Sequence, residues 1–189
     1  MVRPYLALLF VVAVERLYEL WLSRRNAERA FRAGGIEVGA EHFRWMRGLH
    51  TAFLAACALE VLLLHRPFDP RVGLPMLGLA LLAQLLRYWA IATLGDRWNV
   101  RVIAVPGRPV VTGGPYRWLR HPNYVAVVVE GFALPLVHGA WLTAIVFSFL
   151  NAWLLRVRIE VEERVLSEHC GYEEGLGRRA RFLPIRGAR

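Results

Sequence analysis

Two polar segments in the second half of the chain combine residue types and spacing that suit ligand chemistry. The first reads Gly-Gly-Pro-Tyr-Arg-Trp-Leu-Arg-His-Pro-Asn-Tyr over residues 113–124. Glycine lets the backbone approach a ligand closely, and a proline that can start a helix follows Arg120 and His121. Backbone N–H groups at such a start, beside arginine and histidine, suit a carboxylate or another anion. The segment therefore predicts a ligand site, with Tyr116 and Tyr124 supplying aromatic faces and hydroxyls.

The second segment contains one arginine and two glutamates at helical spacing. Arg158 and Glu162 are four positions apart and share a helix face, with Glu163 one step round. The segment follows directly from an apolar run, where carboxylates could hold a cationic or hydroxyl-bearing ligand. An arginine beside them could orient a substrate anion. Spacing alone leaves a second interpretation open, a solvated helix with internal ion pairs.

The composition is that of a membrane protein. Hydrophobic residues make up 56% of the 189 residues, and the mean hydropathy is positive. Several apolar runs approach or exceed the roughly 20 residues that cross a bilayer core. The predicted fold is an all-α integral membrane protein with about five transmembrane helices and a cytosol-facing C-terminal cofactor pocket. The predicted spans are residues 4–22, 49–64, 72–94, 123–136 and 140–156.

The length predicts a single membrane domain over residues 1–189. Strand-like pieces at 100–105 and 109–112 interrupt its long polar connection. Its parts are three spans within 1–94 with the basic loop 23–47, and a catalytic region, 95–189, containing the connecting loop, the helical hairpin 123–156 and a cytosolic tail.

The positive charge is distributed by loop. Every basic residue is an arginine, and the net charge is +9. Arginines gather in 23–47, 95–122 and the tail, whereas the turns 65–71 and 137–139 are poorer in them. This positive-inside pattern predicts an outside N-terminus and a cytosolic C-terminus. Because no single basic face results, we expect membrane lipid as a partner and no nucleic acid.

Three charged residues fall inside the first predicted span. Glu15 and Glu19 are four apart and share a helix face, and Arg16 can pair with a neighbouring helix. A packing role and a substrate or assembly role are both open for them. The second span is short, so His50 and His65 are expected near the two membrane interfaces.

The two cysteines carry no chemical signal. Cys57 lies in an apolar run and Cys170 in a polar tail, so a disulfide is not expected. Neither has the spacing of a metal-ligand set, and no metal site is predicted.

In this order, the two polar segments resemble the isoprenylcysteine carboxyl methyltransferase family of integral membrane enzymes. The resemblance covers about residues 90–186. The matched patterns are Leu-Gly-x-x-Trp at 94–98, Gly-x-Tyr at 114–116, Arg-His-Pro-x-Tyr at 120–124, Arg-x-x-x-Glu-Glu at 158–163 followed by Leu166 and Gly171, and Arg-Phe-Leu-Pro at 181–184.

The resemblance implies S-adenosylmethionine as the cofactor. It implies that Arg158 holds the acceptor oxygen, with Glu162 and Glu163 as the other catalytic residues. Glu162 would also complete the cofactor pocket. The other residues implied to enclose the cofactor are Val111, Gly114, Tyr116, Arg120, His121, Pro122 and Tyr124.

The first half is similar to a narrower bacterial branch that methylates lipid-like polyketides such as alkylpyrones, and this similarity implies a bacterial cytoplasmic membrane. The similar pieces are 15–20, 23–26, 34–37 and 41–43. The acceptor is therefore open between an isoprenylcysteine carboxylate and an alkylpyrone-like enol or phenol. One departure concerns the tail, where the family's tyrosines three and six residues after the glycine are replaced. Those positions hold Glu174 and Gly177, and Tyr172 stands beside the glycine instead.

Two other functions compete with methyl transfer. A membrane reductase of the sterol-reductase type has a similar C-terminal part but uses NADPH. A non-catalytic membrane protein would use its arginines and glutamates for topology and ion pairs.

Overall fold

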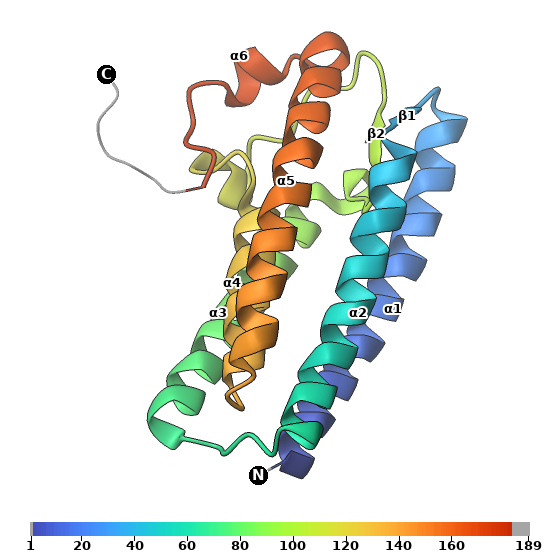
Figure 1. Ribbon diagram of the computed structural model, residues 1–189. Coiled ribbons are helices and arrows are strands. Elements are labelled where there is room, and N and C mark those ends of the chain that lie inside the picture. Colours follow the sequence, from blue (N-terminus) through green and yellow to red (C-terminus); the bar gives the residue numbers. More distant parts are fainter. Residues whose placement is uncertain (1, 183–189) are drawn as a thin grey trace.

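Five long helices run up and down in chain order, joined at one end by short turns and at the other by longer segments (Figure 1). The computed structural model describes residues 2–182. Its elements are α1 (Val2–Arg32), β1 (Ile36–Val38), α2 (Ala40–Leu63), α3 (Pro70–Leu94), η1 (Gly95–Arg97), β2 (Val102–Ala104), η2 (Gly114–Arg117), α4 (Pro122–Leu136), α5 (Trp141–Cys170) and α6 (Tyr172–Leu176). The mostly helical fold and the hairpin of α4 and α5 agree with the prediction.

Local chemistry explains where several helices begin. Asp69 caps α3 by accepting the backbone N–H of Arg71 at 2.9 Å. Prolines occupy the first positions of α3 and α4, where a missing N–H costs nothing. The start of α5 is capped from another helix, because Glu60 of α2 accepts the N–H of Thr143 at 2.7 Å. This contact fixes α5 against α2.

Three of the described helices are long and apolar enough to cross a membrane: Phe43–Leu63, Pro70–Arg97 and Trp141–Cys170. Helix α4 is apolar but shorter, and α1 carries the charged group predicted in the first span. Large apolar side chains on α5 face outward, with Phe149 75% exposed and Trp153 66% exposed. Large apolar side chains exposed in this way are suited to contact with lipid. The chain is therefore an integral membrane protein.

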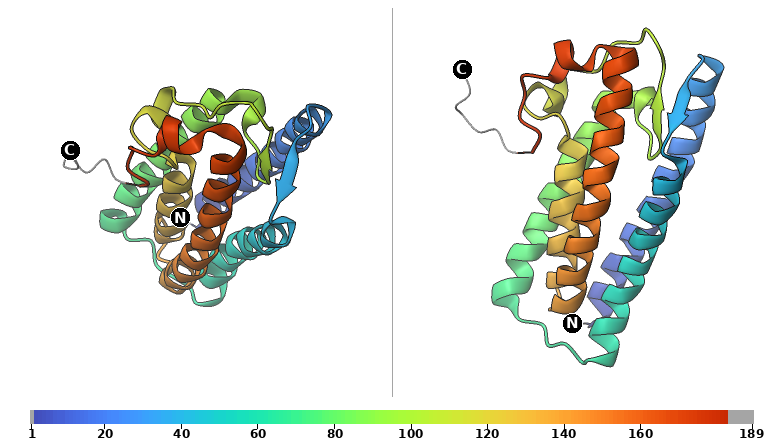
Figure 2. Two further views of the ribbon diagram at one scale, coloured as in Figure 1. Left: turned by 90° about the horizontal axis from the view of Figure 1, so that it is seen from above. Right: turned by 45° about the horizontal axis from the view of Figure 1, so that its top comes forward.

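The arginine-rich segments share one end of the molecule. The α1–α2 segment, the connection after α3 and the segment after α5 all lie at the upper end in Figures 1 and 2. The turns 64–69 and 137–140 lie at the opposite end. Loop charge had predicted this common end.

The connection after α3 differs from its prediction. Strand β2 falls within 100–105 and pairs antiparallel with β1, with Ile36 opposite Ala104. The fold is therefore not purely helical. No strand forms at 109–112, because Val110 N–H donates to the Cys170 carbonyl at the end of α5. Residues 109–112 therefore pack against the end of α5 and do not pair with a strand.

One of the hydrophobic clusters lies toward the end opposite the arginine-rich segments. It includes Tyr5, Phe53, Cys57, Leu134 and Phe147, from α1, α2, α4 and α5. Cys57 and Cys170 are both buried and free.

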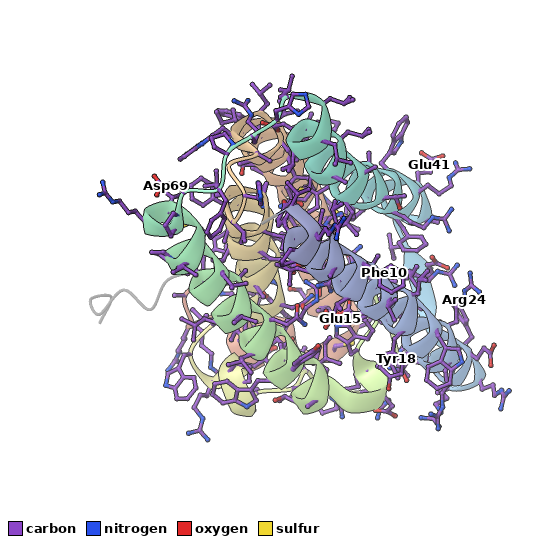
Figure 3. The ribbon with its side chains drawn as sticks, turned by 90° about the horizontal axis from the view of Figure 1, so that it is seen from below. Phe10, Glu15, Tyr18, Arg24, Glu41 and Asp69 are labelled. Carbon is purple, nitrogen blue, oxygen red and sulfur yellow. The ribbon has the colours of Figure 1, made fainter. Side chains whose placement is uncertain are left out.

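At the upper end, α1 lies apart from α3, α4 and α5 (Figure 2). Viewed from below, Glu15 lies on the side of α1 that faces α3, whereas Arg24 and Glu41 lie at the periphery (Figure 3). Helix α2 begins at Ala40, ten residues before His50, so it is longer than the predicted span; the position of His50 near a membrane interface stays a prediction.

Candidate active site

A cavity of about 520 Å³ occupies the upper half of the molecule. Its walls come from all five long helices and from the connection after α3. The predicted residues that line it are Val111, Tyr116, Arg120, His121, Tyr124, Arg158 and Glu162. The two polar segments, far apart in the sequence, thus meet in one cavity because α4 and α5 pack as a hairpin.

Tyr124 joins the two segments directly. Arg158 Nε donates to the Tyr124 hydroxyl oxygen at 2.6 Å, and that hydroxyl donates to Glu162. The spacing of Arg158 and Glu162 had predicted a shared face. Among the described side chains, Arg158 makes a hydrogen bond through Nε alone. The remaining guanidinium N–H groups are available to an anionic oxygen in the cavity.

Glu163 has a different position from Glu162, because it does not line the cavity. Its Oε1 lies 2.9 Å from His121 Nε2 and accepts from the Tyr172 hydroxyl at 3.1 Å. Arg181 donates to both carboxylate oxygens. The carboxylate therefore fixes the His121 ring, which stacks on Tyr124 at 5.3 Å.

Tyr172 is a site residue that sequence reasoning did not assign. Its side chain is 1% exposed and packs with Tyr116. Burial, and then the charge of Glu163, raises the pKa of the Tyr172 phenol above its ordinary value, so the hydroxyl stays a donor. The sequence did contain a signal for it. The family has tyrosines three and six residues after the tail glycine, whereas this chain has Tyr172 directly after Gly171.

Three other predicted residues act on the backbone around the cavity. Arg120 Nε donates to the Arg179 carbonyl at 2.7 Å and so holds the tail against the site. Gly114 has φ +52° and lies against Thr93, where a side chain would collide. Pro122 is the first residue of α4. The matched tail residues Leu183 and Pro184 lie outside the described residues.

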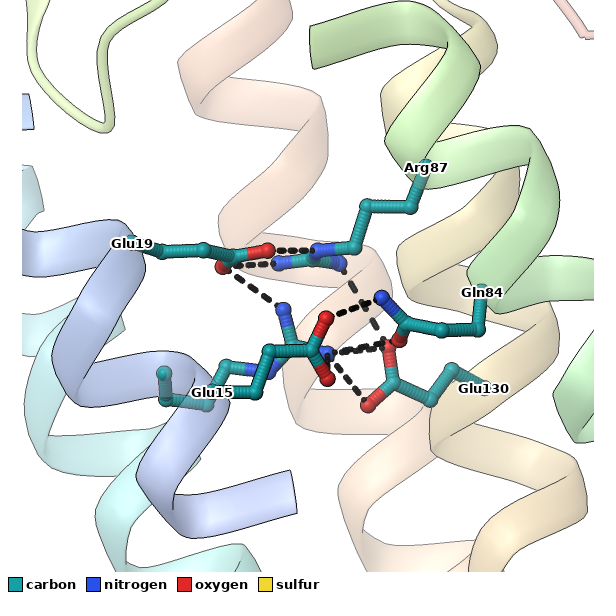
Figure 4. Close-up of polar contacts among 6 residues, drawn as sticks. Glu15, Glu19, Gln84, Arg87 and Glu130 are labelled. Carbon is teal, nitrogen blue, oxygen red and sulfur yellow. Dashed lines mark hydrogen bonds and ion pairs between the residues drawn. The ribbon is translucent and has the colours of Figure 1, made fainter. Parts of the chain in front are cut away.

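A polar cluster lies below these residues, between α1, α3 and α4 (Figure 4). Arg87 contacts Glu19 through two nitrogens, at 2.7 and 3.1 Å. Arg16 donates to Glu19 at 2.6 Å and to Glu130 at 2.9 Å. The predicted pairing of Arg16 with a neighbouring helix is confirmed. The cluster consists of Glu15, Arg16, Glu19, Gln84, Arg87 and Glu130.

The polar cluster reaches the cavity, since Arg16, Glu19 and Arg87 line it. Sequence reasoning had left a substrate or assembly role open for Arg16 and Glu19, and it did not assign Arg87 to the site. It also missed Glu130, although one carboxylate inside a long apolar run was a signal, because ionisable groups in membrane segments are costly and face the interior.

The fold and the cavity together define an integral membrane protein with a polar ligand site at one end of its helices. The family model for isoprenylcysteine carboxyl methyltransferases matches residues 76–168, which include α4 and most of α5. The chain is 36% identical to "Uncharacterized protein YpbQ" of Bacillus subtilis (strain 168), over 86% of this chain and 96% of that protein. It is 26% identical to "Protein-S-isoprenylcysteine O-methyltransferase" of Tribolium castaneum, over 57% of this chain and 41% of that enzyme.

The chain belongs to the isoprenylcysteine carboxyl methyltransferase family. It is therefore a membrane methyltransferase.

Proposed function

We propose that this protein transfers a methyl group from S-adenosylmethionine to an oxygen of a lipophilic acceptor at the membrane. The observation that carries the proposal is that Arg158, Tyr124 and Glu162 form one hydrogen-bonded group on the wall of a single cavity. The acceptors considered are an isoprenylcysteine carboxylate and an alkylpyrone-like enol or phenol.

The cavity residues fit the proposed cofactor. A volume of about 520 Å³ is within the range of small-molecule sites. The Glu162 carboxylate can accept hydrogen bonds from the ammonium group or a ribose hydroxyl of the cofactor. Tyr116 and Tyr172 present buried aromatic rings. When bound, S-adenosylmethionine supplies an electrophilic methyl group on a sulfonium. We assign Val111, Gly114, Tyr116, Arg120, His121, Pro122, Tyr124 and Glu162 to its pocket.

The chain contributes alignment and charge. Arg158 holds the acceptor oxygen, and the Tyr124 hydroxyl fixes the arginine in place. Glu163 contributes by holding His121 rather than by touching the acceptor. Holding a nucleophile and an electrophile in line can supply about 7–11 kcal/mol of a barrier. Burial strengthens each of these contacts, since Arg158 is 8% exposed.

The acceptor's tail enters from the lipid between α1 and α2. Leu17 on α1, and Arg47 and Thr51 on α2, are exposed and also line the cavity. Because these residues are exposed and also line the cavity, they support an opening of the cavity between α1 and α2. The cofactor enters from the arginine-rich end, which we assign to the cytosol from the loop charges. The same loop charges support five spans, with α1 and α4 also crossing the membrane.

Ligand binding to detergent-purified protein tests the cofactor. S-adenosylhomocysteine at a hundredfold excess over its Kd should stabilise the fold by about 2.7 kcal/mol, seen as a higher melting temperature. NADPH should leave the melting temperature unchanged. Stabilisation by NADPH alone would favour the reductase, and stabilisation by neither would favour a non-catalytic protein.

Methyl transfer tests the site. With S-adenosylmethionine and either N-acetyl-S-farnesylcysteine or an alkylpyrone as acceptor, Arg158→Ala should lower turnover by about 10²–10³-fold. Arg156→Ala is the matched control, because its side chain lies on the same helix and is 82% exposed. Equal turnover in both variants would contradict the site assignment.

A further inference from the structure

One imidazole on the cavity wall has a free acceptor nitrogen. His50 Nδ1 lies 2.9 Å from the Met46 carbonyl oxygen. A carbonyl can only accept, so Nδ1 carries the hydrogen and Nε2 carries a lone pair. Among the described side chains, Nε2 has no hydrogen-bond partner. The ring is held edge-on against Phe147, with centroids 5.3 Å apart at 89°, so its orientation is fixed.

His50 lies close to the proposed reaction site. It lines the same cavity as Tyr124 and Arg158. Met46, one helical turn earlier, packs against the group that contains Tyr124. His50 therefore lies one helical turn, about 6 Å of rise, beyond a residue that packs on the Tyr124 group.

Charged groups lie beside the imidazole, and two of them, Arg16 and Arg87, also line the cavity. They are Arg16 of α1, Arg87 of α3 and Glu130 of α4, while α5 contributes the uncharged Phe147. These residues and His50 enclose a second void of about 20 Å³. That volume, with several polar partners, suits a single water molecule.

We propose that His50 is the general base for an acceptor hydroxyl. The proposal rests on the proposed methyl transfer. The O–H bond of the acceptor breaks and its proton goes to His50 Nε2. The oxygen bonds to the methyl carbon, the C–S bond breaks, and the sulfonium sulfur keeps that electron pair. The products are a methyl ether, a neutral thioether and an imidazolium, which returns its proton to water.

This base narrows the acceptor class. A carboxylate is already ionised near neutral pH and needs no base. A phenol has a pKa near 10 and keeps its proton there. A fixed imidazole lone pair beside the acceptor site therefore suits a phenol-type hydroxyl on a lipophilic ring.

Two acceptors with different needs for a base test the proposal. The phenol is 5-pentadecylresorcinol and the carboxylate is N-acetyl-S-farnesylcysteine, both assayed at pH 7.5. His50→Gln should lower kcat with the phenol by about 10²-fold or more, with a loss at least tenfold smaller for the carboxylate. Binding of S-adenosylhomocysteine should persist in this variant. His169→Gln, at the end of α5 and outside the cavity wall, is the control.

The pH profile separates a base from a structural residue. The His50→Gln defect with the phenol should shrink as the pH approaches 10, because the acceptor then ionises by itself. In the wild-type protein, activity with the phenol should fall at acid pH where the imidazole is protonated, and this limb should be absent with the carboxylate. The wild-type profile does not depend on whether the His50→Gln variant folds.

The outcomes distinguish the two proposals. Wild-type turnover of the carboxylate alone would overturn the role of His50 and leave methyl transfer standing. Equal losses on both acceptors in His50→Gln, or a phenol profile without the acid limb, would also overturn it. Turnover of neither acceptor would count against both proposals.

Discussion

Replacing Arg87 by methionine removes the cation that joins α1 to α3 in the polar cluster. Arg87 contacts Glu19 at 2.7 and 3.1 Å and Glu130 at 3.4 Å, and its side chain is 8% exposed. Without it, Glu19 and Glu130 share Arg16 as their cation. A buried charge that loses its partner typically costs about 3–5 kcal/mol.

The expected loss is large on a thermal scale. A domain of this size melts about 2–4 °C lower per kcal/mol, so Arg87→Met should lower the melting temperature by about 6–20 °C. The assay is thermal unfolding in detergent, followed by intrinsic tryptophan fluorescence. Arg156→Met removes an exposed arginine and should leave the melting temperature nearly unchanged.

A compensating variant isolates charge from packing. Glu19→Gln in the Arg87→Met background removes one of the carboxylates left behind. The double variant should therefore be more stable than the sum of the single losses, with a coupling of about 0.5–3 kcal/mol. Additive losses, or an Arg87→Met variant as stable as the Arg156→Met control, would refute the ion-pair reasoning.

Two further substitutions test the tail of the site. Tyr172→Phe removes a hydroxyl that donates to the buried Glu163 carboxylate, so unfolding free energy should fall by about 1.5–3 kcal/mol and S-adenosylhomocysteine should bind more weakly in calorimetry. Unchanged stability would mean that this hydrogen bond does not fix the site. Gly175→Ala places a Cβ 2.5 Å from a Val110 methyl group and should cost about 1–3 kcal/mol in thermal unfolding. Gly48→Ala, where no atom lies within 4 Å, is the control and should stabilise α2 slightly. Equal effects at the two glycines would contradict the packing between α6 and the connection.

Much of the architecture could be predicted from the sequence because membrane helices have a strong local signal, a long run of apolar residues. Apolar runs and the prolines at their starts predicted the helices and the hairpin of α4 and α5. The prediction at 109–112 was wrong, because extended residues there pair with the end of α5 rather than with a strand. The predicted start of the second helix, at residue 49, was too late, because α2 begins at Ala40, before its apolar run does.

The sequence alone determined the two polar segments, the face shared by Arg158 and Glu162, and the common end of the arginine-rich loops. These follow from helical periodicity and from loop charge, which act over short distances along the chain. Tertiary structure decided that Tyr124 bridges the two segments, that Glu163 serves His121, and that the polar cluster opens into the cavity. Those contacts join residues on different helices, and only helix packing sets the distances between them.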